Sequence, residues 1–169
     1  MGMTLLQTVN VGSGGQSTID FNNIAAVAGA DLKLVISGRT DASGIATEYK
    51  MRLNGDSSSV YHTTGLAGDG GGIAKRDVGP TTFLENLSLP KNGATANTFG
   101  SAEIYIHNFS SATTTGITFT AVGENNATES YLGIASWYRD VAEPITSISV
   151  FGELGSFMQH STANLYLIN

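Results

Sequence analysis

The sequence of 169 residues contains no cysteine. Disulfide bonds are therefore excluded as a source of stability, and so is a structural zinc site that binds through thiolates. The sequence also has no apolar run near the ~18 residues that a membrane-spanning helix requires. We therefore expect a fold that is stabilised by its hydrophobic core, and a chain with no membrane partner.

Charged side chains are scarce. They make up 13% of the chain, whereas an average soluble domain has about 25%. The formal net charge is −6, so binding to DNA or RNA would gain nothing from counterion release. We therefore exclude nucleic acid as a partner. Ser, Thr, Asn and Gly must cover much of the surface instead, and these residues meet another surface without the desolvation cost of a charge.

Proline and helical patterning are also scarce. The chain has 3 prolines but 21 glycines, which favours short elements joined by tight turns. Only residues 22–30 suit a turn or two of helix, and a structured loop fits them equally well. Apolar and polar residues instead alternate with a period of two, which is typical of strands with one buried face. The alternation is clear over 32–37, 49–53, 102–107, 117–121 and 163–167, and weaker over 4–11, 17–21, 58–64, 81–89, 130–138 and 145–151.

Many short alternating strands in one chain predict an all-β fold. We expect a single domain over residues 1–169, built as a jelly-roll-like antiparallel β-sandwich of about ten short strands. The spacing of the strands does not distinguish a jelly roll from other Greek-key sandwiches.

A glycine-rich segment, GLAGDGGGIAKRDVGP, occupies residues 65–80. Its glycines disfavour a regular strand, so we predict a long surface loop here. Two interpretations stay open: a flexible connection, or a loop that contacts a partner in an assembly. The candidate contact residues are Leu66, Asp69, Ile73, Lys75, Arg76 and Asp77.

Catalytic and metal-binding motifs are absent from the sequence. It contains neither the phosphate loop G-x-x-x-x-G-K-[ST] nor the nucleophile elbow G-x-S-x-G. His62, His107 and His160 are far apart and lack the spacing of metal ligands. A catalytic triad, a three-histidine metal site or a glycosidase-like carboxylate pair would have to be assembled by folding alone. We therefore predict that the protein is not an enzyme and has no catalytic residue, metal ligand or cofactor.

One cluster, Trp137-Tyr138-Arg139, has the composition of a recognition site, because aromatic residues and arginine are enriched at interfaces and stack on sugars. In a strand, Trp137 and Tyr138 face opposite sides. We expect Trp137 in the core, and Tyr138 and Arg139 as candidate contact residues.

Motifs along most of the chain resemble a group of small β-rich virion proteins and tail-associated domains of tailed bacteriophages, common among marine phages and cyanophages. The most distinctive stretch is ATANTFGSAEIYI at residues 94–106, which ENNATE at 124–129 echoes. Further matching segments are TLLQTV at 4–9 with GSGG at 12–15, DLKLVISGR at 31–39, RLNGD at 52–56, and residues 145–163.

This resemblance implies a structural part of a phage particle. We expect a capsid decoration or cement protein that binds the outer shell and stabilises the joints between capsomers. Its partners would be the major capsid protein or other virion proteins, and it would form a homo-oligomer, a dimer or a trimer. It would assemble in the host cytoplasm and reside on the capsid surface or the tail. The alternative is a tail-fibre or tail-tip adhesin that binds host-surface carbohydrate, and a polysaccharide depolymerase is disfavoured.

Overall fold

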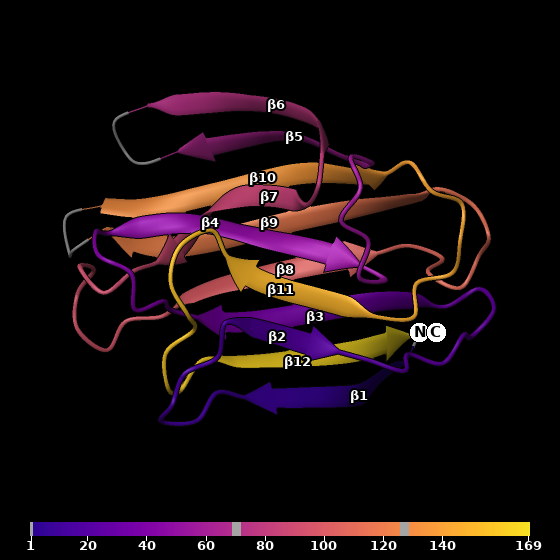
Figure 1. Cartoon of the computed structure of the whole chain (residues 1–169), viewed down its shortest axis with the longest axis horizontal. Helices are drawn as coiled ribbons and strands as arrows, with labels where there is room; N and C mark the ends of the chain where they lie inside the picture. The colour runs from indigo at the N-terminus through magenta and orange to yellow at the C-terminus, as the bar shows by residue number, and fades with distance from the viewer. Residues whose placement is uncertain (1, 69–71, 126–128) are drawn as a thin grey trace.

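The computed structural model describes residues 2–68, 72–125 and 129–169 (Figure 1). This part of the chain is all β, as predicted, with twelve strands and no helix, so nothing in it spans a bilayer as a helix. Residues 22–30 form a loop rather than a helical turn. The strands are β1 (Met3–Asn10), β2 (Thr18–Phe21), β3 (Asp31–Gly38), β4 (Ala46–Leu53), β5 (Tyr61–Gly68), β6 (Ile73–Thr81), β7 (Leu84–Pro90), β8 (Gly100–Ile106), β9 (Thr115–Asn125), β10 (Glu129–Arg139), β11 (Ile148–Gly152) and β12 (Thr162–Ile168).

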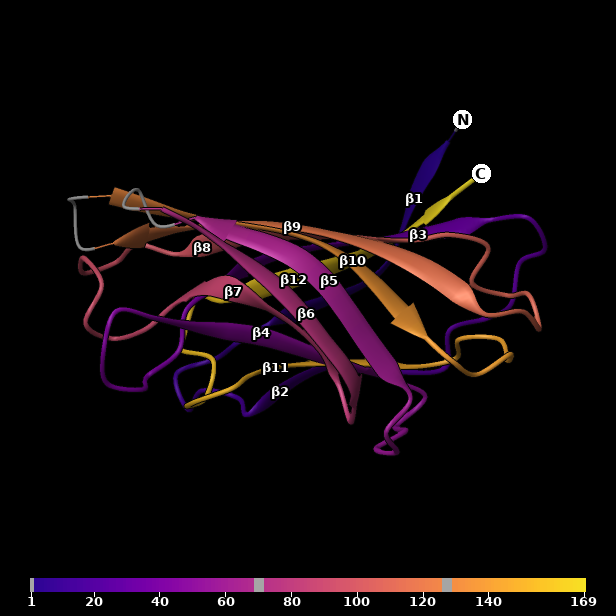
Figure 2. The ribbon, with the colours of Figure 1, turned by 90° about the horizontal axis from the view of Figure 1, so that it is seen from above.

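The strands form two antiparallel sheets that pack face to face, as Figure 2 shows from above. The larger sheet has eight strands in the order β1-β12-β3-β8-β9-β10-β5-β6, and the smaller has four in the order β2-β11-β4-β7. The successive strands β1 and β2, β3 and β4, β7 and β8, and β11 and β12 lie in different sheets. This winding is a jelly roll, and it confirms the predicted fold class.

Two hairpins extend the jelly roll on one side. The hairpin β5–β6 is inserted between β4 and β7, and the hairpin β9–β10 between β8 and β11. Both hairpins join the larger sheet, where β9 pairs with β8 and β5 pairs with β10. The larger sheet is therefore wider than the smaller one. Ile73, Ala74 and Lys75 are consecutive in β6 and all exposed, so the second sheet does not cover this edge.

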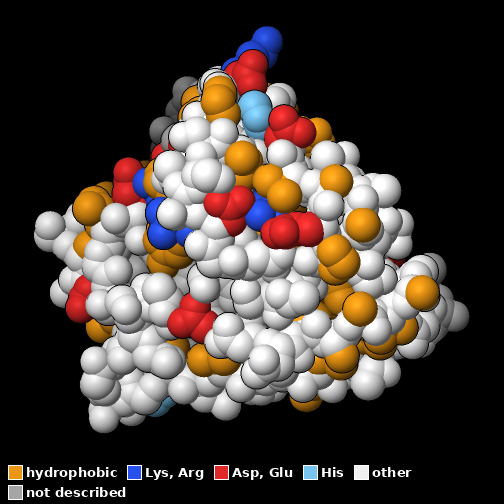
Figure 3. All heavy atoms as spheres, turned by 45° about the vertical axis from the view of Figure 1, so that its right-hand side comes forward, with side chains coloured by type: hydrophobic (Ala, Val, Ile, Leu, Met, Phe, Trp, Pro, Cys, Tyr) orange, Lys and Arg blue, Asp and Glu red, His pale blue; other side chains and the backbone are white. Residues whose placement is uncertain are grey.

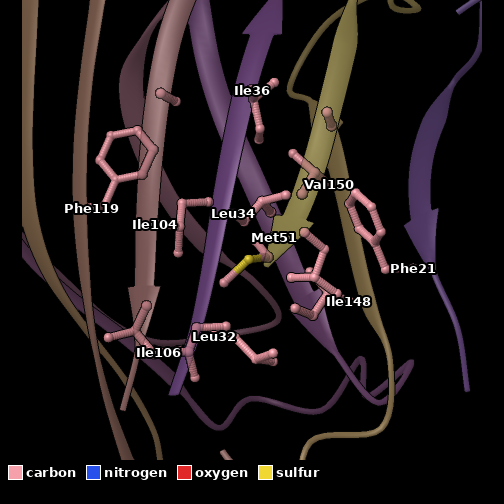
Figure 4. Packing of buried hydrophobic residues seen from close by; sticks show 14 of the residues in the cluster. Phe21, Leu32, Leu34, Ile36, Met51, Ile104, Ile106, Phe119, Ile148 and Val150 are labelled. Atoms are coloured by element: carbon pink, nitrogen blue, oxygen red, sulfur yellow. The ribbon is translucent and has the colours of Figure 1, made fainter. Parts of the chain in front are cut away.

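The core lies between the sheets and follows the alternation of the sequence. Leu32, Leu34 and Ile36 of β3 are buried, while the residues between them are half-buried. Figure 4 shows them packed towards Met51 of β4 and Val150 of β11 in the opposite sheet. A period of two thus places one set of side chains in the core and the other on the outer face.

The prediction of a loop over residues 65–80 is wrong for most of this segment. Residues 65–68 end β5, and residues 73–80 belong to β6, which pairs with β5 in antiparallel register. The reason lies in tertiary packing: a Cβ on Gly65 would lie 2.8 Å from the carbonyl oxygen of Ile134 in β10. Glycine at this position permits close approach of two strands, a known role of strand glycines.

Replacing Gly65 with alanine should lower the free energy of unfolding by about 1–3 kcal/mol, because the added methyl group overpacks a site bounded by rigid backbone. Urea unfolding followed by fluorescence measures this change. Gly116 of β9 is the matched control, since no atom lies within 4 Å of its Cβ position. Gly116→Ala should be neutral or slightly stabilising, and equal losses in both variants would contradict the role assigned to Gly65.

Candidate functional site

The outer face of the hairpin extension carries a cluster of exposed aliphatic side chains, here called the apolar patch. Its members lie on β5, β6, β9 and β10 and are between 44% and 77% exposed. They are Leu66, Ile73, Val122, Leu132 and Ile134.

Strand register brings the apolar patch together. Ile134 pairs with Leu66 of β5, and Leu132 pairs with Val122 of β9. Gly68 lies between Leu132 and Ile73, pairing with both. The alternate residues of β10 face the other way: Ala135 and Trp137 are buried in the core. The patch therefore follows from the same alternation that builds the core, on strands whose outer face no second layer covers.

A shallow hollow with a volume of ≈ 420 Å³ adjoins the patch. Leu66 and Ile134 line it together with Lys75 and Asp77, which belong to β6, the outermost strand of the sheet. Thr64 also lines the hollow, and its hydroxyl donates a hydrogen bond of 3.2 Å to the Asp77 carboxylate. An aliphatic surface with charged groups at its margin has the layout of a protein interface, with an apolar centre and a polar rim.

Four of the contact residues predicted from the sequence therefore lie together: Leu66, Ile73, Lys75 and Asp77. Asp69 lies outside the described residues, and so does the side chain of Arg76. Val122, Leu132 and Ile134 were missed by the sequence interpretation. Alternation with the buried Trp137 was a signal that could have identified Leu132 and Ile134, because both lie an odd number of residues from it.

The predicted orientations of Trp137 and Tyr138 are confirmed. Trp137 is fully buried and stacks on Phe119, with the ring centroids 4.5 Å apart. Tyr138 is 38% exposed, and its ring lies 5.8 Å from that of His62 on the neighbouring strand. Tyr138 is four residues along β10 from Ile134, which corresponds to about 13 Å in a strand.

Arg139 is not a surface contact residue, and this part of the prediction is wrong. Its side chain is 5% exposed and forms ion pairs with Asp56 at 2.7 Å and Glu143 at 2.8 Å. The physical reason is again the alternation of β10, because Arg139 lies two residues from Trp137 and so points towards the same inner side. Its charge is neutralised at the end of the sandwich and is not available to a partner.

The carboxylates around Arg139 are held in their charged form. Hydrogen bonds from Ser58 and from Arg139 lower the pKa of Asp56 to about 2. The amide of Asn54 and then Arg139 lower the pKa of Glu143. Arg139, Asp56 and Glu143 therefore form a stabilising charge network. They do not form an acid–base pair, in which one pKa would be raised and the other lowered.

Within the described ranges, no group of three or more His, Asp or Glu side chains is arranged to hold a metal ion. His62 lies beside Tyr138, whereas His107 lies 3.6 Å from the Asp31 carboxylate near the start of β3. Charged side chains form only small groups on the side of the molecule shown in Figure 3, where uncharged surface predominates.

The apolar patch is therefore the feature of the described surface that best suits a contact with another protein. In comparisons with known proteins, no family model and no curated protein matches this chain. The resemblance to virion proteins of tailed phages stays a prediction.

Proposed function

We propose that this protein is a structural component of a bacteriophage particle, namely a decoration protein that binds the outer capsid shell through the apolar patch. Its partners would be the major capsid protein and further copies of itself, as a dimer or a trimer. The observation that carries this proposal is the group of five exposed aliphatic side chains on one face of the hairpin extension.

The size of the apolar patch fits weak contacts that are repeated many times. Burying a fully exposed Leu or Ile side chain contributes about 1.5–3 kcal/mol, so five side chains that are about half exposed contribute on the order of 5 kcal/mol. Association itself costs an estimated ~4–15 kcal/mol. A single patch is therefore marginal, whereas several patches on one oligomer engage a repetitive shell together and gain from effective concentration.

The fold and the surface composition also support this proposal. Jelly rolls are used by viral capsid and lectin domains, although this is an analogy at the level of the fold. The scarcity of charge lowers the desolvation cost when surfaces meet. A tail adhesin that binds through Tyr138 and Arg139 is less well supported, because Arg139 is buried.

Replacing Leu66 and Ile134 together with aspartate should weaken binding to empty capsids of the cognate phage by at least about tenfold, because two charges would be buried in an apolar contact. Co-sedimentation of purified protein with shells measures the affinity and the saturation ratio. Leu154→Asp is the matched control, since Leu154 is 52% exposed but lies in the loop after β11.

Saturable binding of the wild type and of Leu154→Asp, with loss in the double variant, supports the proposal. Equal sedimentation of the double variant and the wild type would exclude the apolar patch as the binding surface. Absence of the wild type from the shell pellet would exclude the decoration role. Circular dichroism of each variant establishes that the fold is retained.

A further inference from the structure

A second hollow lies at one end of the sandwich, and its lining residues differ from those of the first hollow. It is a cleft with a volume of ≈ 360 Å³, formed between the loop from β7 to β8 and the loop from β11 to β12. Its lining residues are Arg39, Asn92, Ala94, Ala96, Asn97, Phe99, Met158, Gln159 and His160. None of these residues belongs to the apolar patch.

Arg39 organises the first wall of this cleft. The residue directly follows β3 and is 4% exposed. Its guanidinium donates hydrogen bonds to four carbonyl oxygens of the loop from β7 to β8, those of Asn92, Ala94, Thr95 and Thr98, at 2.6–3.1 Å. These bonds draw the loop into a ring around one buried cation, which fixes the backbone of the wall.

The second wall is attached to the same residue through the backbone. The carbonyl oxygen of Arg39 accepts a hydrogen bond of 2.8 Å from the amide of Met158, and the amide of Arg39 donates one of 3.2 Å to the hydroxyl of Ser161. Glu124 of β9 adds support to the first wall by accepting hydrogen bonds from the amide and the hydroxyl of Thr95. Both walls are therefore held in place before any ligand arrives, which lowers the entropic cost of binding.

Three carboxamide side chains lie at the opening of the cleft. Asn92, Asn97 and Gln159 are exposed, and their side-chain amides make no hydrogen bond to any other residue that the structure describes. Each amide offers both a donor and an acceptor. Phe99 and Met158 are half-buried and give the cleft an apolar lining.

Two residues at the cleft have an uncommon backbone conformation. Asn97 has φ of 65° and His160 has φ of 75°, and both are in the left-handed region. Asparagine tolerates this region better than most residues, whereas histidine does so less readily. Such conformations recur where a backbone is held in place for binding, and here one occurs in each wall.

We propose that this cleft binds one neutral pyranose ring, either as a free sugar or as a residue of a glycan. Sugar hydroxyls donate and accept hydrogen bonds, as carboxamides do, and an apolar sugar face can pack on an aromatic ring such as Phe99. An anionic ligand fits less well, because the charge of Arg39 is already surrounded by carbonyl oxygens. The volume lies near the lower end of the ~300–1,000 Å³ range of small-molecule sites, which suits a single ring.

The test uses the full chain and a panel of soluble glycosides, namely methyl α-D-glucopyranoside, methyl α-D-mannopyranoside and methyl β-D-galactopyranoside, with N-acetylneuraminic acid as the anionic comparison. Saturation-transfer NMR detects binding, and amide chemical shifts of the protein locate it. At least one neutral glycoside should bind, with shift changes concentrated in residues 92–99 and 157–160. If a glucoside or mannoside binds, a tetrasaccharide of the same sugar then distinguishes a glycan from a free sugar. A glycan ligand predicts that the tetrasaccharide binds more tightly than the methyl glycoside.

Asn97→Gly and Gln159→Ala should each weaken binding by up to about tenfold, the effect of losing one hydrogen bond. Asn97→Gly keeps the left-handed backbone accessible. Asn23→Gly is the matched control, because Asn23 also has a positive φ, of 56°, but lies in the loop before β3, at the opposite end of that strand from Arg39.

Weaker glycoside binding by Asn97→Gly and by Gln159→Ala, together with normal binding by Asn23→Gly, supports the proposal. Failure of every neutral glycoside to bind the wild type would overturn it, as would binding of the anionic sugar alone. Unchanged glycoside binding by both of these variants would show that the sugar does not bind in this cleft. Shell binding is measured independently, so the sugar cleft and the decoration role can succeed or fail separately.

Discussion

Replacing Trp137 with alanine should lower the free energy of unfolding by about 3–5 kcal/mol. Trp137 is fully buried between the sheets and stacks on Phe119 at a centroid distance of 4.5 Å. Its indole nitrogen donates a hydrogen bond of 3.2 Å to the carbonyl oxygen of Glu85 in β7 of the opposite sheet. The substitution therefore removes a large apolar contact and also leaves a buried carbonyl without this donor.

The adjacent residue supplies the control for this prediction. Tyr138 points to the outer face and is 38% exposed, so Tyr138→Ala should change the free energy of unfolding by less than about 1 kcal/mol. Urea unfolding followed by far-ultraviolet circular dichroism suits both variants, because it does not depend on tryptophan fluorescence. A larger loss in Tyr138→Ala than in Trp137→Ala would contradict the assigned orientation of β10.

Replacing Arg139 with methionine should destabilise the protein by about 3 kcal/mol at neutral pH, within the range measured when one partner of a buried ion pair is removed. Arg139 is 4% exposed and lies against Asp56 and Glu143. Methionine preserves much of the side-chain volume, so little packing is lost. The decrease in the free energy of unfolding therefore comes mainly from the two carboxylates, which stay charged after the guanidinium is removed. Because Glu143 is 43% exposed, water compensates part of this effect.

The free energy of unfolding of the wild type should also fall in acid, because Asp56 and Glu143 lose their charge there. The folded pKa values of Asp56, about 2, and of Glu143 lie below their ordinary values of 3.8 and 4.5. Carboxyl groups with lowered pKa values contribute stability above their unfolded pKa, and they lose it as the pH falls through the folded pKa. The contribution is therefore complete near neutrality and declines from about pH 5 towards pH 2.

Urea unfolding of the wild type and of Arg139→Met over this pH range measures how stability depends on pH. The difference between their free energies of unfolding should become smaller in acid. Hydrogen bonds from Ser58 and Asn54 will retain part of the pH dependence in the variant. Lys33→Met is the control, because the ion pair of Lys33 with Glu103 is at the surface and should contribute less than about 1 kcal/mol. A difference that stays constant down to pH 2 would contradict the role of the carboxylates.

Local alternation made the individual strands predictable. Residues 32–37 and 163–167, for example, lie within β3 and β12, and their predicted inward residues are buried. Alternation applied consistently along β10 also indicates that Arg139 is on the side of Trp137. Arginine usually lies at the surface, but the position of Arg139 in the strand outweighs this preference and buries it.

The glycine-rich segment shows where local rules are insufficient. Glycine has a low strand propensity, yet Gly65 lies in β5 because the backbone of β10 approaches it closely. That approach depends on which strands become neighbours, and strand order is a property of the whole chain. The same holds for the apolar patch, whose residues come from four strands and adjoin only after β9, β10, β5 and β6 are placed side by side.

The sequence by itself determined the all-β class, the position of most strands and the division of their side chains into two faces, because these depend on a period of two along the chain. Tertiary structure alone decided the order of the strands, the extension of one sheet by two hairpins and the cleft around Arg39. The two walls of that cleft are about sixty residues apart in the chain and meet through hydrogen bonds to a single arginine. Contacts between such distant segments arise from backbone pairing across the fold, which no local pattern of residues specifies.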